Sequence, residues 1–218
     1  MHIFKRHAFH WRQKSFILTS ATGVILLALS VVANYFAGLY ADNKMSNSVT
    51  DLILSNLPVV NVDPIFVEGF ALFLLVVFAL AFWEPKRIPF VLKSVALFIF
   101  VRSFFVILTH IGPFPVTSPV DGGFFTDKIN FTGDLFFSGH TGLPFLMALT
   151  FWNNRLWRNI FLSATALFAA TVLLGHLHYS IDVFGALFIT FSIHNLALVF
   201  FKKDFELFEK IVSYEIRV

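Results

Sequence analysis

The chain has 218 residues, of which 57% are hydrophobic and 18% aromatic, and it carries a formal net charge of +3. With a mean hydropathy of +0.79, it has more apolar surface than a soluble domain of this length can bury, so the composition excludes a soluble globular protein and predicts a polytopic membrane protein. The lack of cysteine excludes disulfides, thiolate catalysis and cysteine metal sites. The basic residues stand beside apolar segments and form no patch interleaved with aromatic residues, so nucleic acid is not expected as a partner.

Six apolar segments are interpreted as helices that cross a hydrocarbon core of about 30 Å, and the fifth of them is short. The sequence therefore predicts an all-α membrane protein with one six-helix transmembrane domain at residues 15–201. Residues 1–14 form a basic and aromatic segment expected at the headgroups, and residues 202–218 form an amphipathic cytoplasmic tail. The predicted spans are Phe16–Ala37, Ile65–Trp83, Pro89–Ile111, Leu135–Trp152, Ile160–Leu174 and Leu177–Phe201.

The distribution of basic residues predicts how these spans are oriented. Lysine and arginine are concentrated on the side that holds both termini, and by the positive-inside rule that side is cytoplasmic. Both termini are therefore expected in the cytoplasm. The cytoplasmic set is Lys5, Arg6, Arg12, Lys14, Lys86, Arg87, Arg155, Arg158, Lys202, Lys203, Lys210 and Arg217, against Lys44 and Lys128 in the opposite loops.

Several features near the second and third spans need an explanation. The connector Tyr40–Pro64 is expected to hold a short interfacial helix at the outer surface. Glu68 lies about one turn into the second span, where either a snorkelling carboxylate or a functional group fits. Lys93 is close enough to the inner face to reach it, whereas Arg102 lies roughly 14 Å below the outer end of its span. The partner of Arg102 is either a substrate phosphate or a carboxylate such as Glu68, and the sequence leaves both open.

Two short polar segments interrupt the apolar chain where the fourth and sixth spans begin. Residues 133–141 contain His140, and residues 175–182 contain His178 and Asp182. His178 and Asp182 are four residues apart, so on a helix they can meet on one face, where the carboxylate accepts the proton of one ring nitrogen and leaves the other nitrogen as a nucleophile. With His140 as proton donor and acceptor, this set suits phosphoryl transfer through a covalent intermediate, a scheme that requires no metal.

The predicted topology puts both segments at the non-cytoplasmic ends of their spans. The site that they form is therefore expected on the extracytoplasmic side, which is periplasmic or lumenal. Three further histidines, His110, His176 and His194, are interpreted as packing or hydrogen-bonding residues, the usual role of a lone histidine in a membrane helix.

The two segments resemble the catalytic motifs of the type 2 phosphatidic acid phosphatase superfamily. The resemblance is carried by Phe137-Ser138-Gly139-His140-Thr141 and His178-Tyr179-Ser180-Ile181-Asp182. In more detail, Gly133–Thr141 and His178–Val183 are similar to the sphingomyelin synthase branch, as are Arg102-Ser103, Thr109 and Gly112–Pro115.

The resemblance implies a role for each motif residue. His178 is the nucleophile that forms a phosphohistidine, Asp182 orients it, and His140 is the acid and base partner. No metal or other cofactor is implied. Substrate contacts are expected from Arg102, Asp134, Ser138, Gly139 and Tyr179.

The chain departs from the phosphatase pattern of that superfamily in three places. The Lys-x6-Arg-Pro motif is missing, Phe137 stands where a proline is usual, and Thr171-Val172 stand where a Ser-Arg pair is usual. The missing basic groups would bind a phosphomonoester. Their loss favours a phosphodiester donor, whose transferred group carries less charge and can be held by Arg102 and helix ends.

The leading hypothesis is a lipid phosphotransferase that moves a phospho-headgroup from a phospholipid to a lipid alcohol such as ceramide. With water as the acceptor, the same three residues would make a lipid phosphate phosphatase or a phospholipase C-type hydrolase, so the sequence does not separate the acceptors. A non-catalytic scaffold or a transporter is less favoured, because all three catalytic positions are intact and the sequence lacks broken spans in paired halves. Phospholipid and lipid-alcohol substrates are the expected partners, and a homo-oligomer is left open.

Overall fold

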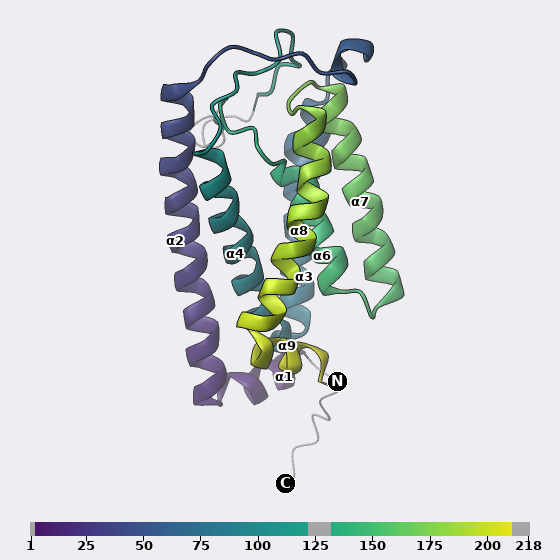
Figure 1. The fold of residues 1–218 in the computed structure, drawn as a ribbon. Coiled ribbons are helices and arrows are strands. Elements are labelled where there is room, and N and C mark those ends of the chain that lie inside the picture. The colour runs from purple at the N-terminus through teal and green to yellow at the C-terminus, as the bar shows by residue number, and fades with distance from the viewer. Residues whose placement is uncertain (1–2, 122–131, 211–218) are drawn as a thin grey trace.

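The computed structural model describes residues 3–121 and 132–210, and these two ranges form helices joined by loops, with no β-strand among them. The predicted all-α class is thereby confirmed for the described residues, and the long helices run side by side (Figure 1). The α-helices are α1 (Ile3–Trp11), α2 (Lys14–Lys44), α3 (Phe70–Trp83), α4 (Ile88–Val106), α6 (Gly139–Thr150), α7 (Arg155–Leu174), α8 (Ser180–Phe200) and α9 (Lys202–Glu209). Three short helical turns are η1 (Leu54–Asn56), the π-helical η2 (Ile65–Gly69) and η3 (Pro85–Arg87).

The number of helices with spanning length differs from the prediction. Five stretches are long and apolar enough to cross a membrane: Lys14–Lys44, Ile65–Trp83, Pro85–Val106, Arg155–Leu174 and Ser180–Phe200. In the predicted fourth span, Leu135–Trp152, only the 12 residues of α6 are α-helical. At 1.5 Å per residue α6 is roughly 18 Å long, shorter than a hydrocarbon core of about 30 Å. The described residues thus contain five helical stretches of spanning length, and α6 is shorter than any of them.

A side-chain cap sets the start of α6, and a turn follows its end before the next helix is capped. At its start, the Ser138 side chain accepts a hydrogen bond from Thr141 N and caps the helix. Just before that cap, the Phe137 carbonyl accepts from the Arg102 guanidinium. After its end, the Asn154 side chain caps α7. Apolar length does not reveal such caps, so the predicted span was too long at both ends.

The first helix is longer than predicted, and the connector after it is less helical. α2 continues past Ala37 to Lys44, and its last turns pack against neighbouring loops, where Ala41 is fully buried. Asp42 Oδ1 accepts a hydrogen bond from Gly133 N at 2.5 Å. The predicted interfacial helix of the connector is reduced to the three-residue 3-10 turn η1.

Two other boundaries also differ. α4 ends before the predicted Ile111, and α8 begins at Ser180 rather than at Leu177. The start of α8 is set by a capping box, in which the Asp182 carboxylate accepts a hydrogen bond from Tyr179 N at 2.9 Å. This cap matters for function, because it includes a predicted site residue.

The two ends of the bundle carry different elements. α1 and α9 lie at one end, and the loops that follow α2 and precede α8 lie at the other (Figure 1). At the α1 and α9 end, Arg6 pairs with Glu84 at 2.8 Å, and Lys93 pairs with Asp204 at 2.7 Å. Lys93 is only 8% exposed, and its ion pair joins α4 to α9.

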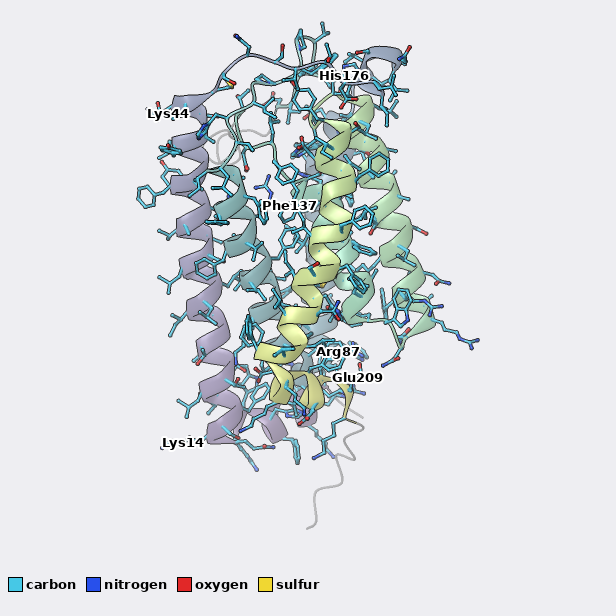
Figure 2. All side chains as sticks on the ribbon, in the orientation of Figure 1. Lys14, Lys44, Arg87, Phe137, His176 and Glu209 are labelled. Atoms are coloured by element: carbon cyan, nitrogen blue, oxygen red, sulfur yellow. The ribbon has the colours of Figure 1, made fainter. Side chains whose placement is uncertain are left out.

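The core lies where α4, α6 and α8 approach one another. A Cβ at Gly142 of α6 would lie 2.7 Å from the Phe98 ring of α4 and 2.9 Å from Thr190 Oγ1 of α8, so only glycine permits this approach. Phe98 packs edge-on against Phe137, with ring centroids 5.5 Å apart. Side chains project outward from the helices (Figure 2). Many of the exposed ones are large and apolar, Phe78 among them, as on a lipid-facing surface.

Candidate active site

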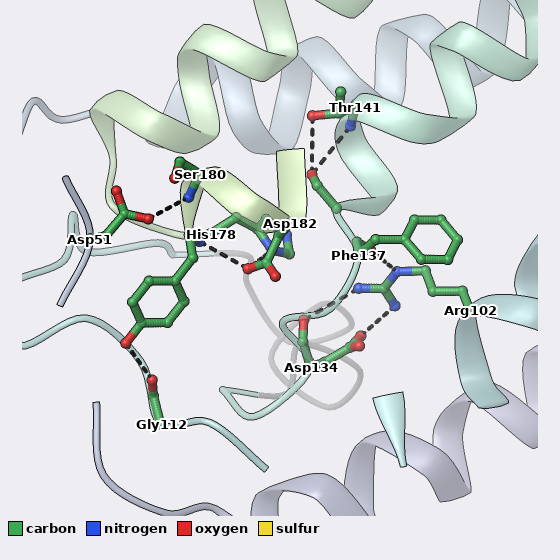
Figure 3. A network of polar contacts seen from close by, with 11 residues as sticks. Asp51, Arg102, Gly112, Asp134, Phe137, Thr141, His178, Ser180 and Asp182 are labelled. Atoms are coloured by element: carbon green, nitrogen blue, oxygen red, sulfur yellow. Dashed lines mark hydrogen bonds and ion pairs between the residues drawn. The ribbon is translucent and has the colours of Figure 1, made fainter. Parts of the chain in front are cut away.

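His178 and Asp182 meet at the start of α8 (Figure 3). His178 Nδ1 lies 3.5 Å from Asp182 Oδ2, and both side chains are buried. His178 precedes the first helical residue, so the cap of α8, rather than a helical turn alone, brings the two side chains together. The same carboxylate oxygen accepts from Tyr179 N, which fixes its position. A carboxylate beside one ring nitrogen leaves the other nitrogen for reaction with a ligand.

Ser138 joins the first polar segment to the second. Its backbone N–H donates to the Asp182 carbonyl at 3.1 Å. Its hydroxyl oxygen accepts from Thr141 N at 3.3 Å and from Thr141 Oγ1 at 3.2 Å, and the residue is fully buried. The Ser138 hydroxyl, expected to contact substrate, is therefore engaged in capping α6 in this structure.

His140 lies in the first turn of α6 and is held by aromatic side chains. Its ring stacks on Phe66 with centroids 3.9 Å apart, and the Phe70 centroid is 4.1 Å away. His140 Nε2 lies 3.2 Å from the Phe66 carbonyl oxygen. A carbonyl can only accept, so this hydrogen bond assigns a proton to Nε2. Phe66 belongs to the π-helical turn η2, and such turns are frequent at functional sites.

The Arg102 guanidinium binds the loop that precedes α6 (Figure 3). Its NH1 donates to Asp134 Oδ2 at 2.8 Å, its Nε donates to the Phe137 carbonyl at 2.8 Å, and its NH2 donates to the Asp134 carbonyl at 3.3 Å. Gly139 lies against the guanidinium, and a Cβ there would lie 3.4 Å from Nε. The carboxylate partner is Asp134 and not Glu68, which is exposed and has no hydrogen bond or ion pair within the described ranges.

A cavity of about 270 Å³ lies beside His178. Its wall includes Asp134 and also Phe66, the ring that stacks on His140, so it borders both polar segments. Asp134 Oδ1 is buried and has no hydrogen-bond partner in the part of the chain that is described. The volume is below the range of about 300–1,000 Å³ that is typical of ligand pockets, so it suits a headgroup rather than a whole lipid. The remaining lining residues are Pro113, Thr117, Ser118, Val120, Thr132, Leu135, His176 and Leu177.

Tyr179 connects the outer loops to the start of α8. Its hydroxyl donates to the Gly112 carbonyl at 2.8 Å and accepts from Val49 N at 3.2 Å. The residue is 2% exposed, and burial raises the pKa of the phenol, which keeps it neutral. Tyr179 was expected to contact substrate, but in this structure its hydroxyl is hydrogen-bonded to the outer loops.

Asp51 was missed in the sequence and lies beside the site (Figure 3). Its Oδ2 accepts from Ser180 N at 2.7 Å, and its Oδ1 accepts from Ile53 N at 2.8 Å and from Leu54 N at 3.0 Å. Burial acts to raise the pKa of the Asp51 carboxyl, but these hydrogen bonds outweigh it and hold the pKa below its ordinary value. An aspartate before a turn is a local signal for the bonds to Ile53 and Leu54. No local signal predicts the contact with α8.

The other histidines have separate surroundings. His176 lines the cavity and has a left-handed backbone, with φ 54°, and its Nδ1 lies 3.1 Å from the Val116 carbonyl oxygen. His110 packs edge-on against Tyr40, with centroids 5.4 Å apart. His194 is buried in α8. Across residues 3–121 and 132–210, no three His, Cys, Asp or Glu side chains are grouped so that they could hold a metal ion.

Comparison with protein families finds a match to part of the chain. Residues 132–198 match a family model described as PAP2 superfamily C-terminal. This range includes His140, His178 and Asp182. Neither the search of curated proteins nor the search of solved structures found a match. The match covers less than half of the chain and shows that this region, with both polar segments, is similar to the type 2 phosphatidic acid phosphatase superfamily.

Proposed function

We propose that the protein is a membrane lipid phosphotransferase, similar to sphingomyelin synthases, that moves a phospho-headgroup from a phospholipid to a lipid alcohol such as ceramide. The observation that carries this proposal is the contact of His178 with Asp182 in the wall of a cavity that also borders the loop before α6. A histidine oriented by a carboxylate beside a headgroup-sized space is the arrangement that a covalent phosphohistidine needs.

The reaction divides into two displacements. In the first, His140 starts as an imidazolium, with one proton on Nε2 and one on Nδ1. His178 Nε2 attacks the phosphorus of the phospholipid, the bond from phosphorus to the diacylglycerol oxygen breaks, and His140 donates its Nδ1 proton to that oxygen. In the second, His140 removes the proton of the acceptor hydroxyl, whose oxygen attacks the phosphorus and releases His178. Asp182 holds the Nδ1 side of His178 throughout. Neither step uses a metal, and activity is expected to persist in chelator.

The phosphoryl oxygens need donors other than Arg102, because its guanidinium already binds Asp134 and Phe137. The start of α6 offers two hydrogen-bond donors. The backbone N–H groups of Gly139 and His140 have no hydrogen-bond partner within the described ranges. A helix N-terminus favours negative charge, so we assign the phosphoryl group to the space between this end of α6 and His178.

Hydrolysis with water as the acceptor is the second candidate. It is supported by the family match at residues 132–198, which fits phosphatases as well as phosphotransferases. The same three side chains serve both reactions, and only the molecule that enters for the second displacement differs.

We also propose that α6 completes six membrane crossings, with the site on the extracytoplasmic side. Two observations support an even number of crossings and this orientation. α1 and α9 lie at the end of the bundle opposite the site (Figure 1), and most of the lysines and arginines lie at or beside that same end, in these helices, in the turns after α3 and α6, and next to the first long helix. The orientation is tested with single cysteines introduced at Lys44 and Arg155. Their labelling by a membrane-impermeant thiol reagent is measured in sealed vesicles. The two positions are expected to be labelled from opposite sides.

The activity itself is tested with purified protein reconstituted in vesicles that contain phosphatidylcholine, phosphatidylethanolamine and phosphatidic acid, with and without ceramide. Mass spectrometry identifies the products. Transfer is supported if diacylglycerol forms only when ceramide is present and if ceramide then carries the phospho-headgroup. Headgroup phosphate or phosphomonoester released equally without ceramide supports hydrolysis. No turnover of any of these lipids contradicts both candidates.

A further inference from the structure

The connector between α2 and η2 crosses the site end of the bundle and touches both polar segments. We call residues 49–54 of this connector the outer strap. Leu54 is 1% exposed and packs in one cluster with Leu135 of the first segment and Tyr179 of the second. Val49 N donates to the Tyr179 hydroxyl. The outer strap is therefore packed against the site rather than free in solvent.

Asp51 is the polar centre of the outer strap. One carboxylate oxygen accepts from Ile53 N and Leu54 N, which shapes the strap itself. The other oxygen accepts from Ser180 N at 2.7 Å, which is the first residue of α8. Asp51 is 8% exposed, so water competes little for these bonds. A single side chain thus fixes the strap and the start of α8 to each other.

The two backbone N–H groups that follow His178 are each held by a different carboxylate. Tyr179 N donates to Asp182, and Ser180 N donates to Asp51. Negative groups at the first turn of a helix are also stabilised by the helix dipole. The backbone that carries His178 is therefore held from inside α8 and from the outer strap at once (Figure 3).

We infer that Asp51 is a positioning residue for His178. It holds the start of α8 so that the His178 ring stays against Asp182 and beside the cavity. Asp51 does not line that cavity, so it acts through the backbone and not on the substrate. This inference rests on the proposed function, because the group that it positions is the proposed nucleophile. A displacement of about 1 Å in a reacting group can cost on the order of 100-fold in rate.

The variant Asp51→Asn tests the inference. Asparagine has one side-chain oxygen, so its NH2 must face either Ser180 N–H or the N–H groups of the strap, and donor then meets donor. We expect kcat to fall about tenfold, with KM for phosphatidylcholine unchanged within about twofold. Asp51→Glu restores both acceptor oxygens and is expected to recover part of kcat.

The matched control is Asp63→Asn. Asp63 accepts a hydrogen bond from Asp121 N at 2.9 Å, and no hydrogen bond or ion pair joins it to α8 in the described ranges. This variant is expected to keep the wild-type kcat. If Asp51→Asn does not fold, Asp51→Ser replaces it, because serine keeps a turn-capping oxygen but is too short to reach Ser180. The same loss of kcat is expected.

The outcomes separate this inference from the proposed function when wild type and His178→Ala are measured in the same vesicles. Unchanged kcat in the Asp51 variants overturns the inference while the proposed function stands. The inference is also overturned if Asp51→Glu does not restore any of the lost kcat, or if Asp63→Asn loses kcat to the same extent. In either case a general structural defect explains the loss. Turnover by His178→Ala, or none by wild type, overturns both.

Discussion

The backbone N–H of Ser138 donates to the carbonyl of Asp182 at 3.1 Å, and this bond joins the two polar segments of the site directly. Ser138 caps the helix that carries His140, and Asp182 contacts His178. One backbone hydrogen bond therefore helps to set the spacing between the two histidines. The site depends on how α6 and α8 begin, and several measurable consequences follow from that.

Gly142→Ala is expected to destabilise the fold. The added Cβ would lie 2.7 Å from the Phe98 ring and 2.9 Å from Thr190 Oγ1, so α4 or α8 must shift. Overpacking of this kind costs about 1–3 kcal/mol, and thermal unfolding in detergent should show a lower Tm. Gly69→Ala is the control, because a Cβ there meets its nearest atom at an ordinary 3.6 Å. Equal Tm values for the two variants would contradict the close approach of α6.

Arg102→Ala is expected to lower stability and not only substrate affinity. It leaves the Asp134 carboxylate without its cation and the Phe137 carbonyl without its donor. Removing one partner of a fully buried ion pair typically costs about 3–5 kcal/mol, and the expected loss here is smaller because this pair is partly buried. The double variant Arg102→Leu/Asp134→Leu should regain part of the lost Tm, because no buried charge is left unpaired. If the single variant keeps the wild-type Tm while KM rises, Arg102 binds substrate instead.

Phe66→Leu is expected to lower kcat while the fold is kept. Leucine retains the carbonyl that binds His140 but loses the ring that stacks on it at 3.9 Å. An aromatic contact of this kind is worth about 0.5–1.5 kcal/mol, so kcat should fall by up to about tenfold. Phe78→Leu is the control, because Phe78 is exposed on α3 and is 65% accessible. A kcat for Phe66→Leu equal to that of Phe78→Leu would show that the ring does not orient His140.

The contribution of Asp51 to stability should disappear in acid. Hydrogen bonds hold the pKa of its carboxyl below the ordinary value in the folded state. For a group with a lowered folded pKa, the stabilisation is present above the unfolded pKa, about 3.9, and is lost as pH falls through the folded value. The Tm of wild type should therefore exceed that of Asp51→Asn at neutral pH, and the difference should shrink below about pH 4. A difference that is constant from pH 7 to pH 3 would contradict this.

The long helices and the two polar segments were predictable because their signals are local. Apolar runs mark α2, α3, α4, α7 and α8, and the end of α7 at Leu174 agrees with the prediction. The spacing of His178 and Asp182 predicted that they meet, and they lie 3.5 Å apart. They do not meet as two residues of one helix, as the spacing suggested. His178 precedes the helix, and the cap of α8 brings the two side chains together.

Features that depend on distant contacts were not predictable from the sequence. The sequence offered Glu68 as a partner for Arg102, but the loop before α6 supplies Asp134 instead. The contact of Asp51 with Ser180 joins positions far apart in the chain and has no periodic signal. Hydropathy also gave the fourth span too many residues, since it does not register the polar contacts that end a helix.

The most direct test of the central claim is to trap the covalent intermediate on His178. Protein in vesicles is mixed with phospholipid labelled in the phosphate, quenched rapidly in alkali, digested and analysed by mass spectrometry. The account predicts an acid-labile phosphoryl group on His178 in wild type and in the control His110→Gln, and none in His178→Ala, which should also lack turnover. Label on another residue, or turnover by His178→Ala, would contradict the account.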